Sequence, residues 1–178
     1  DHNGSRGLGD VYKRQGYKSN DSNYTNYFGK IYEARYLSGL AAGSLTESNK
    51  IGYVAAFPIP EVIRGINAFA NGVKEVNPNA TVEVVWTNTW FGPEEETQAA
   101  NALIEAGADV LTQHQDSAST GIAAEAAGAK WIGYHTGYGK DAAPSAFVTA
   151  PVWNWGPLYT EMVNACLLYT SPSPRDPL

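Results

Sequence analysis

Residues 49–116 read NKIGYVAAFPIPEVIRGINAFANGVKEVNPNATVEVVWTNTWFGPEEETQAANALIEAGADVLTQHQD. Apolar residues recur at every second position in some segments of this stretch and at every third or fourth position in others, as expected of strands and helices respectively. Strands that alternate with helices in this way predict a parallel sheet with crossover helices. Such sheets bind ligands at the carboxyl ends of their strands, where this chain places Phe57, Trp90 and Asp116. A binding cleft is therefore the first hypothesis.

Composition limits the classes of function that the chain can serve. Its 178 residues are enough for one domain with a substantial apolar core. The net charge is -6 and no run of Lys or Arg occurs, so the basic surface of a nucleic-acid-binding protein is missing. The single cysteine, Cys166, excludes an internal disulfide and a cysteine-based metal site. No segment approaches the roughly 20 apolar residues of a membrane span.

The two ends of the chain differ from its body. Residues 1–15, DHNGSRGLGDVYKRQ, and residues 166–178, CLLYTSPSPRDPL, match neither a helical nor a strand period. Both resemble peptides translated from sequencing-adaptor DNA, so we interpret them as non-native tails and exclude them from the fold. A flexible native tail is the alternative. On our interpretation the native protein covers about residues 16–165 and is cut at both ends, so the lack of a signal peptide has no meaning.

The body predicts a regular alternation of elements. Residues 27–43 predict a helix that Gly43 closes as a left-handed stop. Residues 51–56 are uniformly apolar and predict a strand buried on both faces. Further helices are predicted at residues 60–76, 93–106, 117–127 and 156–165, and further strands at residues 81–87, 109–113, 130–134 and 146–150. This order predicts a doubly wound α/β lobe with right-handed crossovers. The helices before and after it are typical of a chain that passes between two lobes.

Five blocks of the body carry a family resemblance: IGYVAAFPIPEVIRGINAF, VVWTNTW, GADVLTQHQDS, WIGYHTG and TAPVWNWGPLY. In this order they resemble the basic membrane protein family, the PnrA-like substrate-binding lipoproteins of ABC transporters. The resemblance implies an α/β fold of the periplasmic-binding-protein type I class, with two lobes joined by hinge strands. It assigns residues 16–48 to the end of the first lobe, residues 49–140 to the second lobe, and residues 141–165 to the return crossing.

The resemblance also implies a function. Members of the family bind purines or purine nucleosides between the lobes and deliver them to a membrane permease without chemistry. We therefore expect the substrate-binding component of an ABC importer rather than an enzyme, located in the periplasm or anchored as a lipoprotein. Its expected partners are a small-molecule ligand and an ABC permease, with no nucleic acid and no cofactor, and we expect a monomer. The residues agree, because no phosphate-binding loop and no Ser-His-Asp or Cys-His arrangement is discernible.

A flat heterocycle is bound by an aromatic face and a few oriented polar groups. Phe57 and Trp90, which follow the first two strands of the predicted lobe, are the candidate stacking surfaces. Asn88 and Asp116 can hydrogen-bond the edge of a base or the hydroxyls of a ribose. The predicted ligand-binding rim is completed by His135, Thr136 and Asn154.

Three of these assignments have structural alternatives. Phe57 can instead close the apolar core of the lobe. Asp116 can be the N-cap of the helix predicted from residue 117, where its carboxylate would accept hydrogen bonds from the free backbone N–H groups. Asn154 lies between Trp153 and Trp155 in the return crossing, so this segment can be hinge packing instead of a ligand contact.

The ligand and the role of the protein also leave alternatives. Many members carry an acidic residue in the block that here reads GYHTGYG, where it binds ribose, but this chain has His135 and Thr136. The change favours a free base such as adenine over a nucleoside. His114 and His135 have no third ligand at metal spacing, so they do not predict a metal site. A ligand-sensing domain of a regulator or receptor is the alternative function, because a fold does not fix a function.

Overall fold

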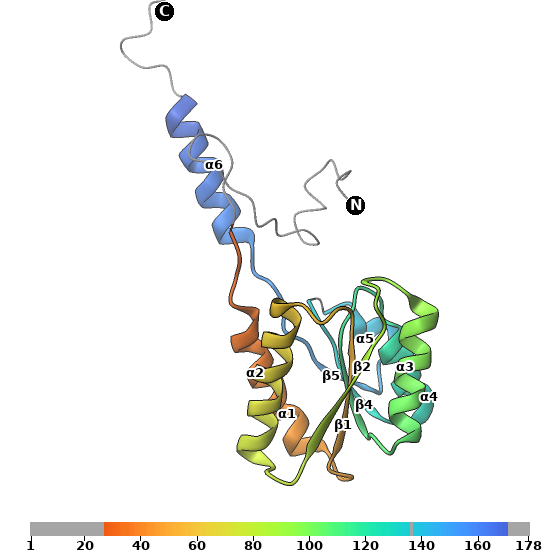
Figure 1. Ribbon diagram of the computed structural model, residues 1–178. Coiled ribbons are helices and arrows are strands. Elements are labelled where there is room, and N and C mark those ends of the chain that lie inside the picture. The colour runs from red at the N-terminus through yellow and green to blue at the C-terminus, as the bar shows by residue number, and fades with distance from the viewer. Residues whose placement is uncertain (1–26, 136, 171–178) are drawn as a thin grey trace, which may run out of the picture. The chain divides into compact units, whose positions relative to one another are not determined.

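The computed structural model describes residues 27–170 except residue 136. Thr136 and most of the two predicted tails, residues 1–15 and 171–178, thus lie outside the described residues. The described residues from Tyr32 onward belong to one compact unit. The elements follow in the order α1 (Ile31–Leu45), β1 (Lys50–Ala55), α2 (Pro60–Val76), β2 (Thr81–Trp86), α3 (Pro93–Glu105), β3 (Val110–His114), α4 (Ser119–Ala127), β4 (Lys130–Ile132), α5 (Gly139–Ala142), β5 (Phe147–Thr149) and α6 (Gly156–Thr170), as labelled in Figure 1.

The five strands form one parallel sheet in the order β2-β1-β3-β4-β5. Within this sheet, Ile51 of β1 lies opposite Val82 of β2 and Val110 of β3. After β1, the chain forms the edge strand β2 on one side of β1, and then β3 on the other side. This confirms the predicted doubly wound α/β sheet and places the reversal of strand order between β1 and β3.

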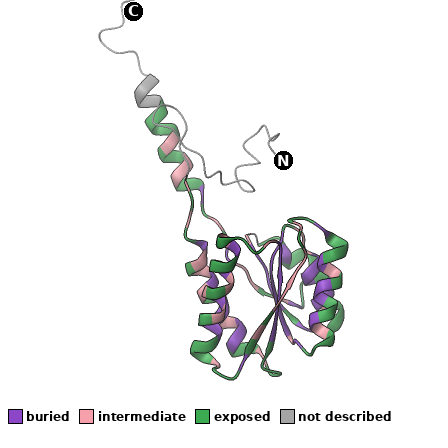
Figure 2. Cartoon of the chain, viewed as in Figure 1, coloured by how far each residue is buried: buried purple, intermediate pink, exposed green. Residues whose placement is uncertain are grey.

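Helices cover both faces of the sheet (Figure 1). On one face, Tyr53 of β1 packs edge-on against Phe69 of α2, with ring centroids 5.6 Å apart, in a core that also takes in Ala42 of α1. On the other face, Val54 of β1 belongs to a core formed with α3 and α4, which includes Leu103. Figure 2 shows buried residues along the sheet and on the helix faces turned toward it. The strand at β1 is thus buried on both faces, as predicted.

Helices α1 and α2 cross in direct backbone contact. A Cβ atom on Gly39 would lie 2.0 Å from the carbonyl oxygen of Phe69, and one on Gly72 would lie 2.1 Å from that of Tyr36. The predicted left-handed stop at Gly43 is wrong, because α1 continues to Leu45. Gly43 lies against α2 instead, where a Cβ would approach the Val73 carbonyl oxygen to 2.8 Å. Close helix packing therefore explains this glycine.

Other boundaries differ from the prediction at the ends of elements. Helix α2 has the predicted bounds, and Gly128, with a φ of 73°, ends α4 in the left-handed conformation as predicted. Strand β4 ends at Ile132, two residues before the predicted end, and its pairing with the short strand β5 is irregular between Trp131 and Ile132. Helix α5 was not predicted. Within the described residues, no helix combines the length and the apolar character needed to cross a membrane.

Candidate ligand-binding site

A group of aromatic rings begins at the carboxyl ends of β2, β1 and β3. Trp90, in the loop after β2, lies 5.4 Å from Phe57, which follows β1, measured between ring centroids. Its ring is also 6.0 Å from that of His114, the last residue of β3. Loops after β2 and β3 thus bring their side chains together over the end of β1. This is the reversal point of the strand order, where open α/β sheets form their ligand crevices.

The group continues across the other half of the sheet. His114 lies 4.2 Å from Tyr134, which follows β4, and Tyr134 stacks on His135 at 3.5 Å. His135 contacts Trp153, beyond β5, at 5.5 Å, and Trp153 stacks on Trp155 at 4.7 Å. The rings therefore form a continuous row of neighbours along the carboxyl edge, in which Trp90 lies between Phe57 and His114. We call the set Phe57, Trp90, His114, Tyr134, His135 and Trp153 the ring row.

Trp90 is the member of the ring row that is most open to a ligand. Its side chain is 37% exposed, whereas Phe57 beside it is half-buried and His114 is only 4% exposed. An exposed indole supported from below by another ring offers a flat apolar surface. The structure therefore brings the two predicted stacking residues together, with Trp90 outermost.

The predicted polar residues lie around the same edge. Asn88 is exposed and has a φ of 57°, and Asn154 is exposed in the segment after β5. Asp116 is exposed, and its backbone N–H donates to the Trp90 carbonyl oxygen at 2.9 Å. The alternative interpretation of Asp116 as the N-cap of this helix is wrong, because α4 begins two residues later than predicted and follows Ala118 without a side-chain cap.

His135 has unusual backbone geometry. Its φ is 63°, in the left-handed region that non-glycine residues rarely adopt, and its backbone pairs with Val152 in an isolated parallel bridge. Burial, together with the nearby Arg35 guanidinium, lowers the pKa of His135 to about 3. Burial and the charges of Arg35 and His135 also hold the pKa of His114 well below its usual value. Both imidazoles are therefore neutral at physiological pH.

Arg35 of α1 is the main element of the site that the sequence reasoning missed. Its side chain is fully buried, and it donates to the Thr112 hydroxyl at 3.3 Å and to the Gln113 carbonyl oxygen. Its guanidinium carbon lies 4.1 Å from the centre of the Tyr134 ring. The sequence contains one signal, because Arg35 lies four residues after the apolar Ile31 and therefore on the same face of α1.

The Tyr134 hydroxyl lies 2.7 Å from Nε2 of His114. Burial raises the pKa of Tyr134 well above its usual value, so the hydroxyl stays protonated. The direction of the hydrogen bond follows the tautomer of His114. Arg35 is thus joined to Tyr134 and His114 of the ring row in one buried assembly of cation–π and hydrogen-bond contacts.

Several buried polar atoms at this edge have no hydrogen-bond partner among the described residues: Arg35 Nε, Tyr53 OH, His114 Nδ1 and His135 Nε2. Buried polar groups are nearly always paired in folded proteins, so such a group of exceptions is unusual. It coincides with the ring row and with the left-handed residues Asn88 and His135. Chemically, this edge can stack a planar or cyclic ligand and hydrogen-bond its rim.

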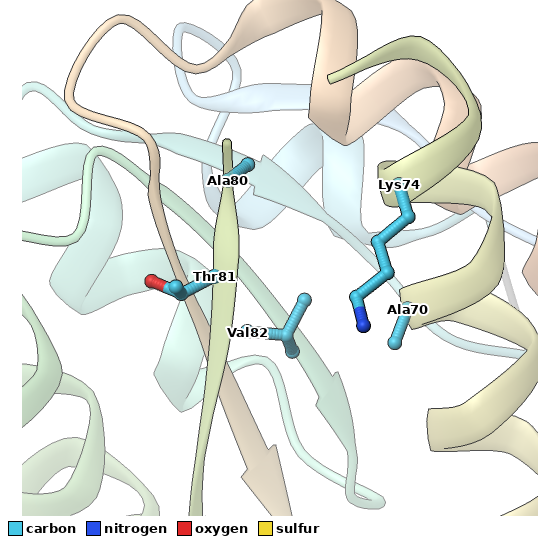
Figure 3. Close-up of a pocket in the computed structure, with 5 residues that line it drawn as sticks. All are labelled: Ala70, Lys74, Ala80, Thr81 and Val82. Carbon is cyan, nitrogen blue, oxygen red and sulfur yellow. The ribbon is translucent and has the colours of Figure 1, made fainter. Parts of the chain in front are cut away.

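Two other features do not add to the site. The described residues contain no group of three His, Cys, Asp or Glu side chains placed to hold a metal ion. A hollow between α2 and the beginning of β2 is lined by Ala70, Lys74, Ala80, Thr81 and Val82 (Figure 3). It lies by the amino end of β2, away from the ring row, and its only charged lining group is the ammonium of Lys74.

Residues 14–171 match the family model described as "ABC transporter substrate-binding protein PnrA-like". The chain is 49% identical over 144 residues to a protein of Haloferax volcanii named as an ABC transporter glucose-binding protein, covering 81% of this chain and 36% of the relative. It is 41% identical over 152 residues to a purine-binding protein of Brucella abortus, covering 85% of this chain and 43% of the relative. The chain thus spans less than half the length of these curated relatives.

The fold also matches that of solved solute-binding proteins. A structure of an ABC transporter solute-binding protein from Conexibacter woesei superposes with a TM-score of 0.67 at 26% sequence identity. The match covers 79% of this chain and 46% of that structure. Together with the parallel sheet, it confirms the predicted fold class.

Proposed function

The chain belongs to the PnrA-like family of ABC transporter substrate-binding proteins, and from this premise we propose that the whole protein is a purine receptor of an ABC importer. It binds a purine base or nucleoside in a cleft between two lobes and delivers it to a membrane permease. It works outside the cytoplasm, free or held by a lipid anchor. A base such as adenine is favoured over a nucleoside, because His135 and Thr136 stand where many members carry a ribose-binding acid.

The observation that carries this proposal is the position of Trp90. Its ring is 37% exposed, rests on Phe57, and lies where the strand order reverses. Stacking of a base on an aromatic side chain contributes about 1 to 3 kcal/mol. A purine is flat and aromatic on both faces, so it matches this surface better than a branched aliphatic ligand would.

Polar groups around Trp90 supply the hydrogen bonds that orient a base. Asn88 and Asp116 are exposed beside its loop, and His135 is a neutral imidazole at the far side of the ring row. Neutral and acidic groups suit a heterocycle whose edge mixes donors and acceptors. No charge on the ligand is required.

A sugar is the second candidate ligand. The relative with 49% identity is named as glucose-binding, whereas the relative named as purine-binding has 41% identity. The apolar face of a pyranose can also stack on an indole ring, and its hydroxyls can bond to Asn88 and Asp116. The two ligands therefore compete for the same surface and must be separated by titration.

The proposed mechanism needs both lobes of the whole protein. Residues 49–140 form the second lobe in this proposal, residues 16–48 end the first, and residues 141–165 lead back to it. The ligand bridges the lobes and stabilises a closed state that the permease recognises. The protein needs no cofactor, because it binds and releases its ligand without chemistry. It acts as a monomer.

The test is a tryptophan-fluorescence titration of the full-length protein with adenine, guanosine and glucose. We expect a saturable response to the purines that weakens at least tenfold in Trp90→Ala, as loss of about 1.4 kcal/mol of stacking would require. Trp86→Phe is the matched control, because Trp86 lies within β2 and outside the ring row. A response to glucose and to neither purine would show that the ligand is a sugar.

A further inference from the structure

The loops after β2 and β3 are bonded to each other across the end of β1. Gln115 is only 2% exposed, and its amide lies between them. With its nitrogen turned toward the carbonyl groups, the amide donates to Thr89 O at 2.9 Å and to Trp90 O at 3.0 Å, and its oxygen accepts from the Thr87 hydroxyl. The Trp90 carbonyl also accepts the Asp116 N–H at 2.9 Å. The loop that carries Trp90 is therefore held at its backbone.

Glu96 makes a second connection between the same loops. It belongs to the first turn of α3, and its side chain is fully buried. One carboxylate oxygen accepts the Gly92 N–H at 3.1 Å, and the other accepts the Ser117 hydroxyl at 2.5 Å. Gly92 ends the Trp90 loop, and Ser117 directly follows Asp116. Glu96 thus fixes the far end of one loop to the start of the next.

A buried carboxylate is an unfavourable way to connect two loops. Removal from water penalises the charged form, and Asp116 and Glu95 nearby add like charge. Burial, more than those charges, raises the pKa of Glu96 even though Ser117 and Gly92 hydrogen-bond to it. A neutral side chain would connect the loops with less opposition. Among the described residues no cation forms an ion pair with Glu96, so its hydrogen bonds are its compensation.

We propose that Glu96 is a positioning residue of the ligand site: together with Gln115 and Ser117, it holds Trp90 and Asp116 in one arrangement before a ligand binds. The role in ligand binding rests on the function proposed above. Order that exists before binding does not have to be created on binding, and this raises affinity. Glu96 itself does not contact the ligand, because its side chain is fully buried behind both loops.

The three glutamates in the first turn of α3 differ in their contacts. Glu94, Glu95 and Glu96 follow one another in the same first turn, where all three face the positive end of the helix dipole. Only Glu96 bonds to both loops, whereas exposed Glu94 contacts Gln98 of its own helix. Glu94→Ala therefore removes the same charge from the same turn without touching the connection.

The test uses the full-length protein labelled with 5-fluorotryptophan. The Trp90 resonance is identified by its loss in Trp90→Phe. In Glu96→Ala we expect that resonance to shift and broaden, while the resonance of buried Trp131 stays in place and reports an intact fold. Glu94→Ala should leave both resonances unchanged. Glu96→Gln should restore the wild-type Trp90 signal, because its amide can accept from Gly92 and donate to Ser117.

Adenine affinity is measured on the same variants. We expect Glu96→Ala to weaken it about tenfold, which corresponds to about 1.4 kcal/mol, while Glu94→Ala and Glu96→Gln stay within about twofold of wild type. If the Trp131 signal shows that Glu96→Ala is unfolded, the same measurements are made on Ser117→Ala and Gln115→Leu. Each of these variants removes an uncharged side chain that connects the two loops. An unchanged Trp90 resonance in a folded variant overturns the proposal. If adenine does not bind wild type, the purine proposal fails, while the Trp90 resonance still decides the role of Glu96.

Discussion

The two ends of the sheet use polar side chains differently. At the amino end, Asp109 accepts hydrogen bonds from the Thr46 hydroxyl at 2.6 Å and from the backbone N–H groups of Glu47 and Ser48 at 2.6 and 2.7 Å. Asn49 there has a φ of 60°, and its side chain accepts from Asn77 at 2.8 Å. These groups close turns and have their partners within the protein.

At the carboxyl end, polar groups are buried with fewer partners. Arg35 Nε, His114 Nδ1 and His135 Nε2 lack hydrogen bonds within the described residues, and Glu96 is a buried carboxylate. Local strain and incomplete pairing concentrate where proteins bind their ligands. We therefore expect substitutions at the amino end of the sheet to reduce stability, and substitutions at the carboxyl end to reduce ligand binding with little loss of stability.

The largest effect on stability is expected from Asp109→Ala. Loss of three hydrogen bonds to a carboxylate should reduce the free energy of unfolding by about 2 to 3 kcal/mol, without a change in adenine affinity. Burial opposes ionisation of Asp109, but its bonds with Thr46, Ser48 and Glu47 together lower its pKa. Its stabilisation is thus present above its unfolded pKa and is lost as pH falls through the folded value. Urea denaturation at neutral and acidic pH checks both points.

Trp90→Ala should show the opposite pattern. We expect adenine affinity to fall by about 1 to 3 kcal/mol, and the free energy of unfolding to change by less than about 1 kcal/mol, because the ring is partly exposed. Calorimetric titration and urea denaturation of the same sample measure the two quantities. A large stability loss without a binding loss would show that Trp90 closes the core instead of binding a ligand.

The neutral histidines predict a loss of stability in mild acid. The pKa of His135 is lowered to about 3, so its stabilisation is complete above the unfolded pKa and is lost between that value and about 3. At about pH 5 the loss should be roughly 1 to 2 kcal/mol for this residue. Unfolding of His135→Gln should therefore depend less on pH than that of wild type. Equal slopes for the two proteins would contradict the prediction.

The smallest effect is expected from Glu96→Gln. Because burial raises the pKa of Glu96, the stability linked to its protonated form is present at low pH and is lost as pH rises through the folded pKa. The amide carries no charge, so the variant should be more stable than wild type above that pKa, by less than about 1 kcal/mol. Thermal unfolding across the pH range checks whether the gain grows with pH.

Local patterns in the sequence were enough to predict the sheet. Each strand and long helix has its own hydrophobic period, so the parallel order and the buried strand β1 followed from neighbouring residues. Gly43 was misread because its role depends on α2, about thirty residues farther along the chain. A close contact between helices has no local signature that distinguishes it from a helix stop.

The candidate site was predictable only in part. Phe57, Trp90, Asn88 and Asp116 could be found because they directly follow predicted strands, and the structure brings Phe57 and Trp90 together. Which of them contact a ligand stays a prediction, as does the role of Thr136, which lies outside the described residues. Arg35 was missed because an arginine in a helix usually faces water, and only tertiary packing places it beneath Tyr134.

The stacked pair Trp153 and Trp155 gives the protein an optical signature of its own. Two indoles with centroids 4.7 Å apart and planes 19° from parallel are close enough for their electronic transitions to couple. Coupled chromophores in a chiral arrangement produce paired circular-dichroism bands of opposite sign, and the amplitude depends on the angle between the transition moments. Since Trp153 also contacts His135 of the ring row, a rearrangement of the segment after β5 would be visible in the spectrum without any added label.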